Sequence, residues 1–192
     1  MRAFVAVTPP AEVVDALWAW TADLREDTPG LRWSRPEQWH LTLAFLGEVP
    51  EEGVDALAER LGRAARRNPP MTLSLGGGGR FGQRVLWTRV RGDRDGLRAL
   101  AGSVQAAARR CRLPVDDRQY RPHLTLARAA AAVDLRPLVE RLADYDGEPW
   151  TARALHLVRS RLGAGPGGTA RHEPVRGWPL GRANSTSTVD TA

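Results

Sequence analysis

The sequence Arg-Pro-His-Leu-Thr-Leu-Ala-Arg at residues 121–128 decides the fold, because a near copy of it occurs earlier in the chain. The copy is Gln-Trp-His-Leu-Thr-Leu-Ala-Phe at residues 38–45, and His-Leu-Thr-Leu-Ala is identical in both. Each stretch alternates polar and apolar residues, which is the pattern of a β-strand with one buried face. We therefore predict two strands that bury their leucines and present a histidine and a threonine, roughly 6–7 Å apart, on the opposite face.

The two copies belong to a longer internal repeat. Leu-Ala-Glu-Arg-Leu at residues 57–61 resembles Leu-Val-Glu-Arg-Leu at residues 138–142, and each half reads strand, helix, motif strand, helix, strand. Only two copies with a period of roughly 80 residues indicate a duplicated lobe rather than a solenoid. We predict an α+β fold with two lobes of antiparallel sheet, built from about 1–76 and 80–162 and related by a pseudo-two-fold axis. That symmetry would place the two motif strands around one central cleft.

The remaining segments fit a single domain. We expect it to span residues 1–181, because residues 182–192 are small and polar, have nothing to bury and are typical of a disordered tail. The glycine run at residues 76–79 lacks the Gly-Lys-Ser/Thr ending of a phosphate loop. We interpret it as a flexible turn between the lobes.

The charge pattern favours an anionic partner. The 192-residue chain has a net charge of +6, and all 28 of its Lys and Arg residues are arginine, whose planar forks suit phosphate. Cys111 is the one cysteine, which rules out an internal disulfide and fits a reducing compartment. No signal peptide precedes the strand predicted at residues 2–7, and no apolar run reaches the roughly 18 residues of a membrane helix. We therefore expect a cytoplasmic protein that is monomeric and makes no membrane contact.

Two histidines and two threonines around one cleft are compatible with three kinds of chemistry. A metal site is disfavoured, because the motifs supply only two good ligands and no clustered cysteine or carboxylate. Nucleophilic catalysis by a hydroxyl needs one nucleophile and one base, and does not call for symmetry. Displacement at a phosphodiester needs a base on the entering oxygen and an acid on the leaving oxygen, so it uses both copies. We expect this third chemistry, with no cofactor.

The paired motifs resemble the two H-x-T-x signatures of the 2H phosphoesterase superfamily. Within it, the chain is similar to the RNA 2′,3′-cyclic phosphodiesterases, also named 2′-5′ RNA ligases. The similarity covers most of residues 1–180 and includes Arg-Ala-Phe-Val-Ala-Val at 2–7, Ser-Arg-Leu-Gly at 160–163 and Trp-Pro-Leu at 178–180. The resemblance implies a bilobal α+β fold with a basic cleft. It also implies metal-independent opening of RNA 2′,3′-cyclic phosphate ends, or of related nucleotides, to 2′-phosphates.

The resemblance also assigns roles to the motif residues. His40 would be the proton donor and His123 the proton acceptor. Thr42 and Thr125 would hold the phosphate. Nothing local distinguishes the two histidines, so their order depends on the resemblance alone.

Four residues outside the paired motifs need interpretation. Arg128, directly after the second motif, and Phe81 are candidates for the cleft wall. We interpret His156 as a plain strand residue and His172 as a surface or packing residue. Because the chain has no lysine, arginines would make the RNA contacts.

Three other functions stay open at this point. The lobes could form a binding module that holds a nucleotide or an RNA end without turnover. A cyclic phosphodiesterase for small nucleotides and a 2′-5′ RNA ligase would use the same motifs.

Overall fold

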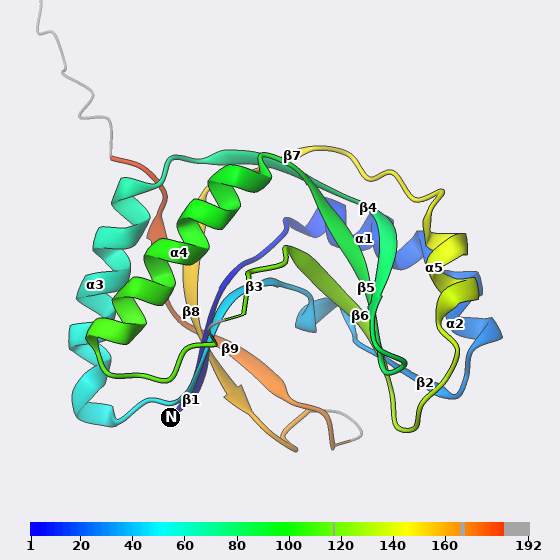
Figure 1. The fold of residues 1–192 in the computed structure, drawn as a ribbon, viewed down its shortest axis with the longest axis horizontal. Coiled ribbons are helices and arrows are strands. Elements are labelled where there is room, and N and C mark those ends of the chain that lie inside the picture. The colour runs from blue at the N-terminus through cyan, green and yellow to red at the C-terminus, as the bar shows by residue number, and fades with distance from the viewer. Residues whose placement is uncertain (117, 166–167, 183–192) are drawn as a thin grey trace, which may run out of the picture.

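The computed structural model describes residues 1–116, 118–165 and 168–182, and it contains two antiparallel sheets (Figure 1). The predicted tail therefore lies, apart from Arg182, outside the described residues. The four-stranded sheet has the order β3 (Leu41–Glu48), β1 (Arg2–Val7), β8 (Ala154–Arg161), β9 (Arg171–Pro179). The five-stranded sheet has the order β2 (Leu31–Trp33), β6 (His123–Ala129), β5 (Val85–Gly92), β4 (Met71–Phe81), β7 (Trp150–Ala152). The predicted α+β class with antiparallel sheets is confirmed.

Helices cover the outer sides of both sheets (Figure 1). The four-stranded sheet carries α3 (Val54–Arg67) and α4 (Arg94–Arg110). On the side of the five-stranded sheet lie α1 (Ala11–Trp20), α2 (Ala22–Asp27) and α5 (Arg136–Leu142). Two short 3₁₀ turns, η1 (Pro36–Gln38) and η2 (Glu51–Gly53), complete the elements named here. The inner sides of the two sheets are left to face each other.

The two sheets do not follow the two halves of the sequence. Strands β8 and β9 come from the second half but join β1 and β3, whereas β2 comes from the first half and pairs with β6. Pairing with β8 covers the edge of β1 that β3 leaves open, and an uncovered edge is a site of aggregation. Each sheet therefore combines strands from both of the predicted segments 1–76 and 80–162.

The motif strands bury their leucines as predicted. Leu41, Leu43, Leu124 and Leu126 are each at most 2% exposed and belong to one apolar cluster that includes residues of both sheets. Full burial of a leucine contributes roughly 1.5–3 kcal/mol. The four side chains therefore anchor both strands and fix which face of each strand is turned toward the other sheet.

The predicted turn at residues 76–79 is wrong, because these glycines lie inside β4. A Cβ atom on Gly79 would stand 2.1 Å from the Trp87 ring, and one on Gly78 would stand 2.7 Å from Cβ of Leu142 on α5. Gly77, with φ at +71°, lies where the register between β4 and β5 shifts. Glycine in a strand interior commonly marks a bulge or a close approach, and both occur here. The run lets Trp87 and α5 pack closely against the sheet.

Replacing Gly78 with alanine is expected to lower the free energy of unfolding by about 1–3 kcal/mol, the usual cost of overpacking. The added methyl would collide with Leu142 and force α5 away from β4. Urea denaturation of the variant measures the loss. Gly30→Ala is the matched control, because no atom lies within 4 Å of its added methyl. Equal stability of the two variants would show that α5 does not depend on a bare strand at this position.

Candidate active site

The two motif strands meet at the centre of the molecule. Strands β3 and β6 lie in different sheets but approach each other between them (Figure 1). The positive charge that His123 can carry is one of the causes that lower the pKa of His40, so the two rings are near enough to interact electrostatically. One chain therefore supplies both halves of the site, and the structure brings the two predicted histidines together.

His40 is held from three sides. It directly precedes β3, and its ring stacks on Phe4 of β1 with 4.4 Å between ring centroids. The ring of His172 from β9 meets it edge-on at 5.2 Å and also contacts Phe4 at 5.0 Å. Nδ1 of His40 lies 2.6 Å from the carbonyl oxygen of Gln38. These contacts leave the ring little freedom to turn.

His123 has an equivalent setting in the other lobe. It begins β6, and Phe81 of β4 meets its ring edge-on at 4.8 Å, while Trp87 of β5 lies 5.8 Å away. Its Nδ1 lies 2.6 Å from the carbonyl oxygen of Arg121. Phe81, predicted for the cleft wall, thus contacts one of the two predicted histidines directly.

The carbonyl contacts fix the tautomer of both histidines. A carbonyl oxygen only accepts hydrogen bonds, so Nδ1 of each ring must carry the hydrogen that it donates. The other nitrogen, Nε2, is then the atom that accepts a proton when the ring is neutral and donates one when it is charged. Both motifs use the carbonyl two residues upstream, and each therefore keeps one titratable nitrogen free of this bond.

Burial makes both imidazoles weaker bases than a histidine in water. Desolvation is the main cause that lowers the pKa of His40 to about 4, followed by the charge of His172, and the Gln38 carbonyl opposes both. Desolvation also lowers the pKa of His123, and the Arg121 carbonyl again opposes it. The guanidinium of Arg128 lowers the pKa of both rings, which places that cation near both.

A bulge in each motif strand changes which residues share the face of the histidine and threonine. Thr42 pairs with Ala6 and Ala44 pairs with Val5, so Leu43 is the extra residue of β3. A bulge of this kind moves the following side chains to the opposite face. Phe45, which pairs with Phe4, therefore lies on the same face as Thr42.

The same irregularity recurs in β6. Thr125 pairs with Trp87 and Ala127 pairs with Leu86, so Leu126 is the extra residue. Arg128 then pairs with Val85, on the face that carries Thr125 and Trp87. The bulges thus place corresponding residues of the two motifs in the cleft: an exposed arginine beside His123, and beside His40 a phenylalanine that is 66% exposed.

His172 is a packing residue, which is one of the two roles expected for it, and one of the rings that it packs against is that of His40. The sequence offered no further indication of this contact than that residue 172 is a histidine. The strand that carries it follows a glycine-rich stretch and lacks the alternation of polar and apolar residues that would show which face His172 occupies. His156 also lies on the cleft face, across from Ala6, but its ring leans over Gly177 and so away from β3. The sequence marked Phe45 only by its position, directly after the five residues that are identical in the two motifs.

The described residues contain neither a candidate metal site nor a helix that could span a membrane. Within residues 1–116, 118–165 and 168–182, no three or more His, Cys, Asp and Glu side chains are grouped so that they could hold a metal ion. In the same ranges, no helix combines the length and the apolar character needed to cross a bilayer.

Comparison with known proteins identifies close relatives. The chain is 33% identical over 182 residues to the RNA 2′,3′-cyclic phosphodiesterase of Geobacillus stearothermophilus, covering 92% of this chain and 56% of that protein. It therefore spans little more than half the length of that relative. It is also 33% identical over 180 residues to the Escherichia coli protein of the same name, covering 93% and 96% of the two chains.

The fold is equally close to solved structures. A crystal structure of E. coli LigT without ligand matches with a TM-score of 0.76 at 28% identity, covering 94% of this chain and 98% of that chain. The complex of E. coli LigT with 3′-AMP matches with the same TM-score at 29% identity and the same coverage. The sequence model of the 2′-5′ RNA ligase superfamily matches residues 13–164. Together with the paired His-x-Thr strands, this match shows that the chain belongs to the 2′-5′ RNA ligase superfamily.

Proposed function

We propose that this protein is an RNA 2′,3′-cyclic phosphodiesterase that opens cyclic phosphate ends to 2′-phosphomonoesters. One observation carries the proposal: two imidazoles of a single chain, each tied through Nδ1 to its own backbone, lie near enough for the charge of one to lower the pKa of the other. The names of the two relatives and the 3′-AMP bound to E. coli LigT support a nucleotide substrate with a phosphate on its ribose.

The chemistry follows from the order of the two histidines that the family resemblance implies. Nε2 of His123 takes a proton from water as the water oxygen bonds to phosphorus. The bond from phosphorus to the 3′ oxygen breaks, and Nε2 of His40 gives that oxygen a proton. The entering and leaving oxygens stand on opposite sides of phosphorus, so two bases on facing strands suit the reaction. Water and the cyclic phosphate are the only reactants, and the product keeps its phosphate on the 2′ oxygen.

The other cleft residues have supporting roles in this scheme. The hydroxyls of Thr42 and Thr125 donate hydrogen bonds to the non-bridging oxygens, where negative charge builds up. Arg128 offsets the same charge from the side of His123. Phe45 presents an exposed ring on the side of His40, 6.1 Å from the ring of Phe4, where a nucleobase can stack.

Product analysis tests the proposal directly. An RNA oligonucleotide with a 2′,3′-cyclic phosphate end should yield only the 2′-phosphate, identified by ³¹P NMR and mass spectrometry. A parallel reaction with an added 5′-hydroxyl oligonucleotide detects ligation, and 2′,3′-cyclic mononucleotides detect the small-nucleotide alternative. Binding of the cyclic end without any product would instead support the module that holds RNA ends.

The pH dependence of kcat/KM should reflect the low pKa of His40. The donor must be protonated and the acceptor neutral, and the pKa of the donor is lowered to about 4 in the unliganded protein. The protonated fraction of His40 falls about tenfold per pH unit above its pKa, and the neutral fraction of His123 stops rising once pH exceeds the lowered pKa of that ring. The value of kcat/KM should therefore drop by about tenfold per unit from the mildly acidic range upward. A bound phosphodiester anion favours charged His40, so kcat should hold to higher pH than kcat/KM.

The His172→Phe variant tests this assignment. It keeps a ring against Phe4 and His40 but removes the charge that lowers the pKa of His40. Burial lowers the pKa of His172 itself, so its charge acts only at acidic pH. The fall of kcat/KM that begins there should therefore move to higher pH in the variant, as pH–rate profiles of the two proteins will show. An unchanged profile, or a shift to lower pH, would contradict a protonated His40.

A further inference from the structure

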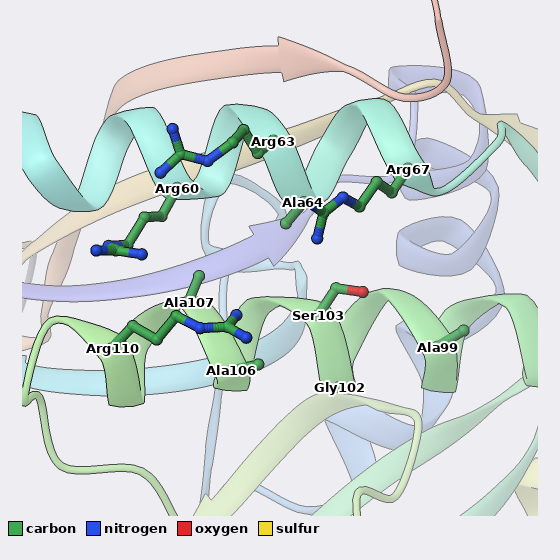
Figure 2. Close-up of a pocket in the computed structure, with 10 residues that line it drawn as sticks. All are labelled: Arg60, Arg63, Ala64, Arg67, Ala99, Gly102, Ser103, Ala106, Ala107 and Arg110. Carbon is green, nitrogen blue, oxygen red and sulfur yellow. The ribbon is translucent and has the colours of Figure 1, made fainter.

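A groove of about 560 Å³ lies between α3 and α4 (Figure 2). Both helices pack their apolar faces on the side of the four-stranded sheet that carries Leu41 and Leu43. Thr42 is on the other side of that sheet. The groove is therefore a surface separate from the catalytic cleft.

Small residues leave the groove open. Its floor consists of Ala64 on α3 and of five residues on α4: Ala99, Gly102, Ser103, Ala106 and Ala107. Nδ2 of Asn68, at the end of α3, donates to Oγ of Ser103 at 3.1 Å and to the carbonyl oxygen of Ala64 at 2.8 Å. This buried amide links the two helices and holds the width of the groove.

Arginines line both sides of the floor. Arg60, Arg63 and Arg67 follow one another along α3, and Arg110 extends toward them from α4 (Figure 2). At 1.5 Å per residue, the three on α3 span about 10 Å of the helix. None of the described residues that line the groove is acidic. Arg63 pairs with Glu59, but Arg60, Arg67 and Arg110 form no ion pair with a described residue.

The outer side of the other lobe has the opposite character. The hollow beside α2 and α5 is lined by Trp20, Asp23, Leu24, Arg141 and Asp144, so carboxylates outnumber arginines there. Arg141 also pairs with Asp27 at 2.8 Å. The chain uses arginine for every Lys or Arg position, yet of these two hollows in the described residues, arginines predominate only in the one between α3 and α4. Overall composition therefore does not explain the cluster.

We propose that the groove between α3 and α4 binds the sugar–phosphate backbone of single-stranded RNA. Guanidinium groups bind phosphate oxygens through two parallel hydrogen bonds, and a row of them suits successive phosphates better than one small anion. An acidic protein partner is disfavoured, because the alanine and glycine floor has no pocket for the large anchor side chains of a protein interface.

The test uses RNA that the catalytic site does not select. A labelled 15-nucleotide single strand with an ordinary 3′-hydroxyl end is titrated with protein, and fluorescence anisotropy is recorded at several salt concentrations. The variant Arg60→Gln/Arg67→Gln/Arg110→Gln should bind at least tenfold more weakly. Its slope of log K against log salt should also be smaller by about 2, since each lost phosphate contact on a single strand contributes about 0.7.

A second triple variant provides the matched control. Arg94→Gln/Arg153→Gln/Arg182→Gln removes the same charge from exposed positions outside the groove and should stay within about twofold of the wild type. Both triple variants should keep full turnover of a 2′,3′-cyclic mononucleotide, which reports on the cleft alone. Failure of that turnover in the wild type would count against the proposed function and leave the groove result intact.

Three results would overturn the groove proposal. The first is wild-type RNA affinity in the groove variant. The second is an equal loss of affinity in both triple variants, which would indicate a general effect of net charge. The third is that polyglutamate binds to the groove at least as tightly as RNA, which would assign it to an acidic protein.

Discussion

Replacement of either His40 or His123 with alanine should lower kcat on a 2′,3′-cyclic phosphate by about 10²–10⁴-fold, the usual contribution of one acid–base group. This range corresponds to about 3–5 kcal/mol of transition-state stabilisation. Each imidazole is proposed to move a proton at a different oxygen, so neither can replace the other. The double variant should be little worse than either single one, because groups that act as a unit are not additive.

The controls for this experiment come from the same sheet. His156→Ala removes a histidine that lies on the cleft face but leans away from β3, and it should change kcat by less than about tenfold. Near-ultraviolet circular dichroism and thermal unfolding establish that each variant is folded, since alanine leaves a gap beside Phe4 or Phe81. Near-normal turnover by a folded His40→Ala or His123→Ala protein would refute the paired mechanism.

The alternation of polar and apolar residues was sufficient to predict which side chains of each motif strand are buried. The leucines of both copies are buried, and the histidines and threonines lie on the opposite face, because strand geometry alone alternates the side chains. The duplication also predicted that the two histidines lie near each other, and the effect of a charged His123 on the pKa of His40 agrees with this. These features depend on residues close together in the chain, where a sequence pattern is most informative.

Pairing between distant strands was not readable in the same way. No local pattern shows that β8 and β9 join β1, and their addition is what places His172 against His40. The bulges at Leu43 and Leu126 are equally hidden, because they appear only when each strand is aligned with its partner. Without a bulge, alternation would assign Phe45 and Arg128 to the buried side.

The glycine run at residues 76–79 was misread for a related reason. Glycines in succession are typical of turns, but here each neighbour that needs the space comes from another element. Trp87 approaches from β5 and Leu142 from α5. Sequence propensity describes what a segment prefers alone, and packing against distant elements overrides it.

The two motifs are nearly identical, yet their surroundings differ in ways that suit different roles. His40 packs against His172 and against Phe4, whose ring also neighbours that of Phe45. His123 packs against Phe81 and Trp87 and shares β6 with Arg128. A cation beside His123 disfavours its protonated form, which is what an acceptor requires at the start of the reaction. The pKa of His40 is lowered as well, however, so the order of the two residues needs a test of its own.

A substrate with sulfur in place of the 3′ bridging oxygen should separate donor from acceptor. The 3′ oxygen needs a proton as it leaves, because an alkoxide is a poor leaving group. A thiol has a pKa of about 8.5, so sulfur leaves as a thiolate without help from an acid. The His40→Ala variant should therefore recover most of its lost rate on the 3′-thio cyclic phosphate, a gain of up to about 10²–10⁴-fold. His123→Ala should stay slow, since its water still has no base.

The rates of both variants on the oxygen and sulfur substrates form a complete set of four measurements. Wild-type protein serves as the reference for the intrinsic effect of sulfur, which must be divided out of each variant. If the His123→Ala protein is the one rescued, the roles are reversed and His40 is the base. A 3′-phosphate product from the oxygen substrate would mean that the 2′ oxygen leaves, and the substrate would then lie in the cleft in the opposite orientation. Rescue confined to His40→Ala, together with a 2′-phosphate product, requires a protonated His40 next to the 3′ oxygen.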